Sequence, residues 1–264
     1  MNTVISKDGT SIAYNKTGSG PAIILVDGAF CSMNFGPMLK LVALLTKDFT
    51  VFAYDRRARG DSGDTKPYSV DREIDDIGAL INEAGGSACL FGISSGAILC
   101  IRAVASGLNI AKLALLEPPF VGNNQGRRSE NAEEQLTQLI AEGKQGAAAT
   151  FYLRKVIGLP AIVAFIIRLT PNWTKMKANA NSLPYDAAVC GDFNIPKDKV
   201  ALVVIPTIVI DSTKSPRVLR DAVQAVAEAL VDGKRISLKG SIHGVPPKIL
   251  VPELAAFYKS GPKK

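Results

Sequence analysis

A serine flanked by glycines, in the segment GISSG (residues 92–96), is the first feature of the sequence that suggests chemistry. The pattern G-x-S-x-G marks a serine held on a sharp turn between a strand and a helix, where its hydroxyl can attack a carbonyl. An apolar run precedes this segment, and a helix-like stretch that ends near Gly107 follows it. The pattern predicts Ser94 as a nucleophile, with an ordinary glycine-rich turn as the alternative. Ser95 is expected to begin the helix.

The chain contains a single histidine, His243, in the stretch LKGSIHGVPPKIL. A serine nucleophile needs a base whose pKa lies near the working pH, and imidazole meets that need. His243 follows the last predicted strand and precedes the last predicted helix, in the loop where such a serine would find its base. We therefore expect His243 to be the general base, with a surface or capping role as the alternative.

A carboxylate usually orients such a histidine and stabilises its charged form. Two acids lie at the ends of predicted strands, Glu117 in LALLEPPF and Asp211 in PTIVID. Glu117 follows four apolar residues and precedes two prolines, at a place where burial makes an unpaired charge costly. Each of these two acids is a candidate partner of His243, and a purely structural acid bonded to backbone amides is the alternative for Glu117.

Short apolar runs alternate with helical patterns along most of the chain. We expect strands at residues 2–6, 10–15, 22–28, 49–55, 88–92, 113–117, 202–211 and 236–240. Helices are expected at 69–85, from 95 to about 107, at 216–233 and at 247–258. This alternation predicts an α/β fold with a mostly parallel central sheet covered by helices on both faces. The first two strands, linked by KDGT, are expected to form an antiparallel hairpin at one edge.

Residues that favour helix caps flank two of these expected helices. Ser69 is a good N-cap and Gly85 a good stop for the first. Ser215 and Pro216 form an N-cap and first-turn pair for the second, and Gly233 is its expected C-terminal cap.

One region breaks the alternation, because residues 122–198 have helical character and no convincing strand. The strand pattern resumes after it. We interpret residues 1–121 and 199–264 as one core domain and residues 122–198 as an inserted helical cap.

The composition limits the partners and the setting. A hydrophobic content of 47% and a charged content of 21% are typical of a soluble globular protein. The net charge of +7 comes from dispersed residues without a recognition motif, so we expect no nucleic-acid partner. No apolar run predicts a signal peptide or a membrane span. Scattered cysteines favour a reducing cytoplasm, and no metal or cofactor is indicated. Monomer and homodimer both stay open.

Several motifs together resemble the α/β-hydrolase superfamily: AIILVDGAF (22–30), YDRRARGDSGDT (54–65), GISSG and SIHG (241–244). The resemblance covers nearly the whole chain and implies the α/β-hydrolase fold, with Ser94 and His243 as nucleophile and base. The segment YDRRARGDSG looks like the superfamily's D-x-R-G-x-G-x-S turn, to which we assign a structural role and no catalytic one.

The resemblance also bears on the acid. Most members of the superfamily carry it a few residues past the strand PTIVID, and the corresponding residue here is Ser215, a neutral hydroxyl. Some branches carry it at the position of Glu117, among them certain haloalkane dehalogenases and the zearalenone-type lactone hydrolases. The latter also resemble this chain in a Ser-Ser-Gly elbow and in Asp-Gly where most members have His-Gly. Glu117 is therefore favoured over Asp211.

By the same resemblance, the oxyanion hole would consist of the backbone N–H groups of Ala29 and Ser95. Fixed donors aimed at a developing oxyanion contribute about 3 kcal/mol each. Asp27 stands where histidine is commoner, and its role stays open.

A serine nucleophile predicts acyl transfer, and the apolar cap segment suggests a small, largely apolar ester or lactone. The expected wall residues are Gly28, Phe30, Phe120, Trp173, Leu183, Tyr185 and Val245. Helix packing is the alternative role for the apolar cap segment. Two other readings stay open: cofactor-free perhydrolysis or carbon–carbon bond hydrolysis with the same triad, and a small-molecule receptor or signalling protein with slow turnover.

Overall fold

The fold is organised around one eight-stranded sheet, seen in a computed structural model that describes residues 1–122 and 131–261. Its strand order is β1-β2-β4-β3-β5-β6-β7-β8. The strands are β1 (Asn2–Ile5), β2 (Ser11–Thr17), β3 (Ala22–Val26), β4 (Thr50–Tyr54), β5 (Ala88–Ile93), β6 (Ile110–Leu116), β7 (Thr207–Ser212) and β8 (Gly233–Leu238). The β1–β2 and β2–β4 pairs are antiparallel and the others parallel. The predicted mostly parallel sheet with an edge hairpin is confirmed.

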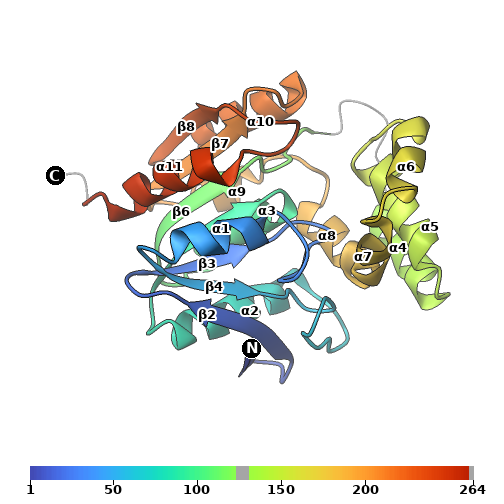
Figure 1. Ribbon diagram of the computed structural model, residues 1–264, viewed down its shortest axis with the longest axis horizontal. Coiled ribbons are helices and arrows are strands. Elements are labelled where there is room, and N and C mark those ends of the chain that lie inside the picture. The colour runs from blue at the N-terminus through green and yellow to red at the C-terminus, as the bar shows by residue number, and fades with distance from the viewer. Residues whose placement is uncertain (123–130, 262–264) are drawn as a thin grey trace.

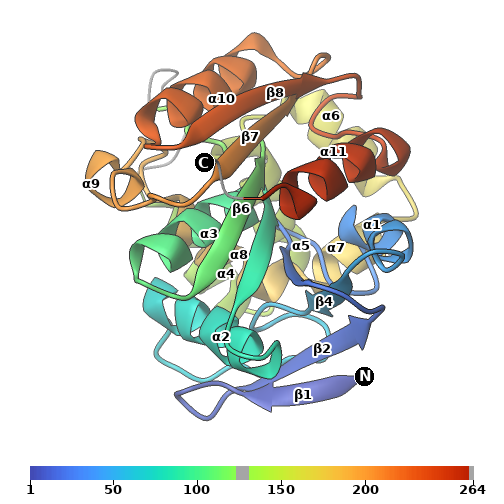
Figure 2. The same ribbon diagram turned by 90° about the vertical axis from the view of Figure 1, so that its left-hand side faces the viewer.

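Helices cover both faces of the sheet (Figures 1 and 2). On one face lie α1 (Met38–Leu45) and α11 (Pro247–Lys259), and on the other lie α2 (Val70–Glu83), α3 (Ser95–Ala105) and α10 (Arg217–Ala229). Successive side chains of a strand point to opposite faces. In β3, accordingly, Ile23 and Leu25 join the core under α1, and Ile24 and Val26 join the core under α3. Burial on both faces explains why the central strands are continuous apolar runs.

Between β6 and β7, the described part of the chain contains helices and no strand. They are α4 (Ala132–Ala141), α5 (Gln145–Phe151), α6 (Ala161–Arg168), α7 (Trp173–Ala178), α8 (Leu183–Cys190) and α9 (Lys197–Val200), with a π-helical turn, η1 (Tyr152–Val156), after α5. Helices α4 to α7 lie to one side of the sheet in Figure 1, and α8 packs on α3. This arrangement supports our proposal that residues 122–198 form an inserted cap on a core of 1–121 and 199–264.

Two expected element boundaries differ from the structure. The strand expected at 202–211 begins only at Thr207, because Pro206 has no N–H to donate and Leu202 and Val204 lie in an exposed turn. Gly233 does not cap α10, which ends at Ala229, but begins β8.

Ser69 precedes α2 as predicted but makes no capping hydrogen bond through its side chain. At the other end of α2, Gly85 has a φ of 97° and stops the helix as expected. Over residues 1–122 and 131–261, no helix is long and apolar enough to cross a bilayer.

Candidate active site

Ser94 lies on the turn between β5 and α3, with φ 56° and ψ −125°. This backbone conformation is sparsely populated by residues other than glycine, and such residues cluster at functional sites. The turn is held because the Ser94 N–H donates to the Leu116 carbonyl at 3.0 Å and the Ser94 carbonyl accepts from Ala97. Helix α3 begins at Ser95, as predicted, so its N-terminus lies directly behind the Ser94 side chain.

The two glycines of the motif are needed for close packing. A Cβ at Gly92 would lie 2.7 Å from the Ala97 Cα, and one at Gly96 would overlap the carbonyl of Val26 at the end of β3. Real Cβ atoms do not approach so closely. These contacts explain why the serine is flanked by glycines at these two positions.

His243 and Glu117 meet at the carboxyl ends of the strands. The His243 Nδ1 lies 2.6 Å from Glu117 Oε2, and the other carboxylate oxygen accepts from the Ser212 N–H at 2.8 Å. Glu117 is fully buried, whereas the His243 side chain is 41% exposed. Both residues have a positive φ, 48° for Glu117 and 53° for His243. This geometry pairs the buried Glu117 carboxylate with the imidazole of His243 and turns Nδ1, rather than Nε2, towards the carboxylate.

Asp211 makes a different set of contacts. Its two oxygens accept from Arg235 at 2.8 and 3.1 Å, and Ser237 donates to Oδ1 at 2.8 Å. This fork-to-fork ion pair holds the carboxylate between β7 and β8. The structure therefore brings Glu117, and not Asp211, to the histidine.

Ser215 does not cap α10, as its sequence context had suggested. No side chain caps this helix, and the Ser215 Oγ instead accepts from the backbone N–H of His243 at 3.0 Å. Ser212 donates to the Ser241 carbonyl at 2.6 Å, which ties the same loop to the end of β7. The loop that carries His243 (residues 239–246) is thus anchored by Ser212, the last residue of β7, and by Ser215, which follows the strand.

Ser94 and His243 line a common cavity of about 630 Å³. Within the described residues no hydrogen bond joins the two side chains. In an unliganded site such catalytic contacts are often long and tighten when substrate binds.

The remaining cavity wall is mostly apolar. Two of the expected wall residues, Gly28 and Phe30, line it. The wall also contains Ala29, which was expected as an oxyanion donor, and residues that sequence reasoning missed: Cys31, Pro37, Ile93, Pro119, Val121, Gly122, Tyr152, Val156, Ile157, Gly158, Leu159, Cys190, Phe193, Pro216, Val218, Leu219 and Ile242. Many of them come from the helical segment between β6 and β7 and from the start of α10. The apolar segment that begins at Val156 was the available signal in the sequence.

The other five expected wall residues lie elsewhere. Phe120 and Leu183 are buried in the core on the α3 face, and Val245 is buried in the core on the opposite face. Trp173 packs against the first of these cores. Tyr185 stacks on Tyr68 with its hydroxyl bonded to Asp64. Their large apolar groups are used for packing, which is the commoner role of such residues in a core.

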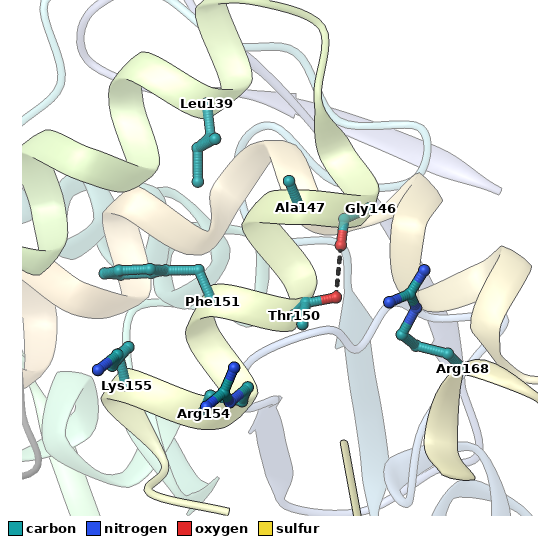
Figure 3. Close-up of a pocket in the computed structure, with 8 residues that line it drawn as sticks. All are labelled: Leu139, Gly146, Ala147, Thr150, Phe151, Arg154, Lys155 and Arg168. Atoms are coloured by element: carbon teal, nitrogen blue, oxygen red, sulfur yellow. Dashed lines mark hydrogen bonds between the residues drawn. The ribbon is translucent and has the colours of Figure 1, made fainter. Parts of the chain in front are cut away.

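A second cavity, of about 490 Å³, is lined by residues of α4, α5, η1 and α6 and is shown in Figure 3. Leu139, Phe151 and the basic side chains of Arg154, Lys155 and Arg168 line it. It contains neither the serine nor the histidine. The candidate active site is therefore the larger cavity. In residues 1–122 and 131–261, no cluster of three or more His, Cys, Asp or Glu side chains could hold a metal ion.

The expected oxyanion donors lie beside Ser94. A Cβ on Gly28 would come within 3.0 Å of the Ser94 Cβ, so the loop that carries Ala29 lies against the serine. Ala29 lines the cavity, and Ser95 is the first residue of α3, whose first N–H groups have no partner within the helix. Neither amide donates to another residue of the part of the chain that the structure describes.

A buried charged cluster lies under this loop, and sequence reasoning missed it. Arg56 donates to Glu73 and Asp186, and Arg59 also donates to Asp186. Asp27 lies beside the two arginines, and burial raises its pKa to about 7 although both arginines lower it. Asp186 comes from α8, between β6 and β7, and gave no local signal, because its partners are about 90 to 130 residues away in the sequence.

The sheet order, the glycine-flanked serine on its elbow and the histidine loop after β8 together define an α/β hydrolase. The model of the alpha/beta hydrolase family matches residues 23–247. The chain therefore belongs to this family.

Solved structures agree with this assignment. An α/β hydrolase from Sphaerobacter thermophilus is 42% identical, with a TM-score of 0.92 over 98% of this chain and 100% of that chain. An esterase from a Rhodococcus species is 21% identical, with a TM-score of 0.71 over 98% of each chain. An enol-lactonase from Burkholderia xenovorans is 20% identical, with a TM-score of 0.68 over 97% of each chain. The last two likenesses establish the fold alone.

Proposed function

We propose that the protein is a serine hydrolase that cleaves carboxyl esters or lactones of small, largely apolar substrates through an acyl-enzyme on Ser94. One observation carries the proposal. The only histidine of the chain lies 2.6 Å from a fully buried carboxylate and lines the same cavity as the strained serine. A buried carboxylate paired with an imidazole at a cavity wall is the arrangement that a serine nucleophile requires.

In this mechanism Ser94 Oγ attacks the substrate carbonyl while His243 Nε2 takes the serine proton. Glu117 accepts the hydrogen bond from Nδ1–H, which fixes the tautomer and stabilises the imidazolium. The oxyanion of the tetrahedral intermediate accepts hydrogen bonds from the N–H groups of Ala29 and Ser95.

Collapse of the intermediate breaks the carbon–oxygen bond, and the imidazolium gives its proton to the departing alcohol oxygen. A water molecule, deprotonated by the imidazole, then attacks the acyl-enzyme. The second tetrahedral intermediate then collapses and releases the carboxylic acid, and the imidazolium returns its proton to the serine oxygen. With a lactone, the acid and the alcohol belong to one product.

The substrate class follows from the wall of the cavity. Tyr152, Val156, Leu159 and Phe193 offer apolar surface, and a volume of about 630 Å³ suits a small molecule. The names of two structural neighbours, an esterase and an enol-lactonase, are consistent with this chemistry. None of the four cysteines, all of which lie in the described residues, forms a disulfide, which is consistent with a reducing, cytoplasmic setting.

The test combines covalent labelling with turnover. An active-site fluorophosphonate should label the wild-type protein on Ser94, and Ser94→Ala should abolish labelling and the hydrolysis of short p-nitrophenyl esters. Ser106→Ala, at the far end of α3, is the matched control and should retain both. The proposal is lost if the label attaches elsewhere or if Ser94→Ala keeps wild-type turnover.

A macrocyclic lactone should be assayed beside the esters. Repeated turnover on either substrate supports a hydrolase. Stoichiometric acylation without product release would instead indicate a slow-turnover receptor.

A further inference from the structure

The peptide group between Gly28 and Ala29 is held from behind by an arginine. The Gly28 carbonyl accepts from Arg59 Nη1 at 2.5 Å, and the preceding carbonyl, of Asp27, accepts from Arg56 Nη1 at 3.2 Å. Because a peptide group is planar and trans, its carbonyl and its N–H point in opposite directions. A cation fixed on the Gly28 carbonyl therefore fixes the direction of the Ala29 N–H.

One carboxylate connects this arginine to the second donor. Asp186 Oδ2 accepts from Arg59 Nη2 at 2.6 Å. Asp186 Oδ1 accepts from Arg56 Nη1 at 2.8 Å and from the Ser95 hydroxyl at 2.7 Å. Ser95 is the residue whose N–H is the other expected oxyanion donor. The side chains of all four residues are buried, so these contacts are shielded from water.

We propose that Asp186 and Arg59 are positioning residues that aim and polarise the two oxyanion donors, Ala29 N–H and Ser95 N–H, so that the hole forms only when the cap helix α8 is packed on the core. The proposal rests on the proposed function. It assigns a function to an arginine of the YDRRARGDSG turn and to a cap residue that touches no substrate.

The charges of the cluster fit such a role. Arg56 and Arg59 are matched by two carboxylates, Glu73 and Asp186, through contacts of 2.6 to 2.8 Å. A donor that is polarised by a cation on its own carbonyl is a stronger donor to a developing oxyanion. The cluster also holds the donors before substrate arrives, so little reorganisation is needed during the reaction.

A neighbouring pair supplies a matched control. Arg57, from the same turn, forms a buried ion pair with Asp76 of α2, with contacts of 2.6 and 2.8 Å. This pair has the same chemistry and burial, but within residues 1–122 and 131–261 it makes no hydrogen bond with Gly28 or Ser95; the other partners of Arg57 are Asp8 and the Arg72 carbonyl. Asp76→Asn therefore measures what the loss of a buried carboxylate does to the fold alone.

The experiment compares Asp186→Asn with Asp76→Asn in the full-length protein. Active sites are titrated with the fluorophosphonate, and kcat on a p-nitrophenyl ester is expressed per titrated site. Inhibition by an aryl trifluoromethyl ketone, which forms a tetrahedral oxyanion adduct, is measured in parallel. Asp186→Asn should lower kcat per site about tenfold to a hundredfold, with KM within about threefold. The inhibition constant should rise by the same factor as kcat/KM falls.

Asp76→Asn should keep kcat per site within about twofold of wild type even if its melting temperature falls. Equal per-site kcat values for Asp186→Asn and Asp76→Asn would overturn the proposal. If Asp186→Asn does not fold, Arg59→Lys takes its place, because lysine lacks the planar fork through which Arg59 reaches the Gly28 carbonyl and Asp186 with separate nitrogens. Wild-type kcat per site in Arg59→Lys would equally overturn it. Failure of the wild-type protein to label on Ser94 would refute the proposed function itself and is read out separately.

Discussion

Asp27 is a carboxylate whose burial should make the stability of the protein depend on pH. It follows β3 directly, is 5% exposed, and its Oδ1 has no hydrogen-bond partner among the described residues. Burial raises its pKa from 3.8 to about 7, although Arg59, Arg56 and the Cys31 thiol act in the opposite direction. The nearby Asp55 adds to the increase. The folded state therefore prefers the neutral acid.

The size of this pH dependence follows from the linkage between proton binding and folding. Between the two pKa values the folded protein binds more protons than the unfolded chain, so stability falls as pH rises, by about 1.4 kcal/mol per pH unit at most. The contribution is fully present below pH 3.8 and is lost as pH rises towards about 7. Between pH 5 and pH 8 the loss amounts to about 2.5 kcal/mol. Asp27→Asn, which has nearly the same shape and no charge, removes this dependence.

Urea unfolding of both proteins at pH 5, 6, 7 and 8 and constant ionic strength is the assay. The free energy of unfolding of Asp27→Asn, relative to wild type, should rise by about 2.5 kcal/mol across this range and flatten above pH 7. Parallel curves for the two proteins would refute the reasoning, and so would a relative stability that falls with pH. Equal m-values in both proteins would show that the comparison concerns the same unfolding transition.

Four further substitutions have defined outcomes. Glu117→Gln should lower kcat about 10³- to 10⁴-fold, because the amide cannot stabilise the imidazolium, whereas Asp211→Asn should lower the melting temperature and leave kcat per titrated site unchanged. Ser215→Ala removes one hydrogen bond to the backbone of the histidine loop, which costs about 1 kcal/mol, and should lower kcat by about fivefold with KM unchanged. Gly28→Ala should slow fluorophosphonate labelling of the elbow serine, because the new Cβ would lie 3.0 Å from the serine Cβ. Wild-type labelling in Gly28→Ala would contradict the proposed close approach.

The elements that carry the candidate site were predictable because their signals are local. The strand before Ser94, the glycines beside it and the helix after it occupy one continuous segment, and each follows a rule about turns, caps or apolar runs. His243 was identifiable because it is the only histidine and follows a strand. Glu117 was visible as a charge at the end of an apolar run.

The substrate wall and the buried charges could not be predicted in the same way. Whether Tyr185 faces the cavity or Tyr68 depends on how α8 packs, and no residue next to it in the sequence decides this. Asp186 is one acid among many until the fold brings it to Arg59, 127 positions away in the sequence. Such contacts join residues that are distant in the sequence and form only in the tertiary structure, so the hydrophobic periodicity carries no information about them.

The position of the acid is explained by the sheet order. Strands β6, β7 and β8 are adjacent and parallel, so a carboxylate that follows β6 and a histidine that follows β8 both reach the end of β7. Glu117 is bonded there through both its backbone and its side chain, since its N–H donates to the Ile210 carbonyl and its Oε1 accepts from Ser212. Ser215 occupies the place where most of the superfamily has the acid, and its hydroxyl still binds the histidine loop through the His243 N–H. Holding the loop and supplying the charge are therefore divided between neighbouring strand ends, so a neutral residue after β7 is compatible with the proposed role of His243 as the base.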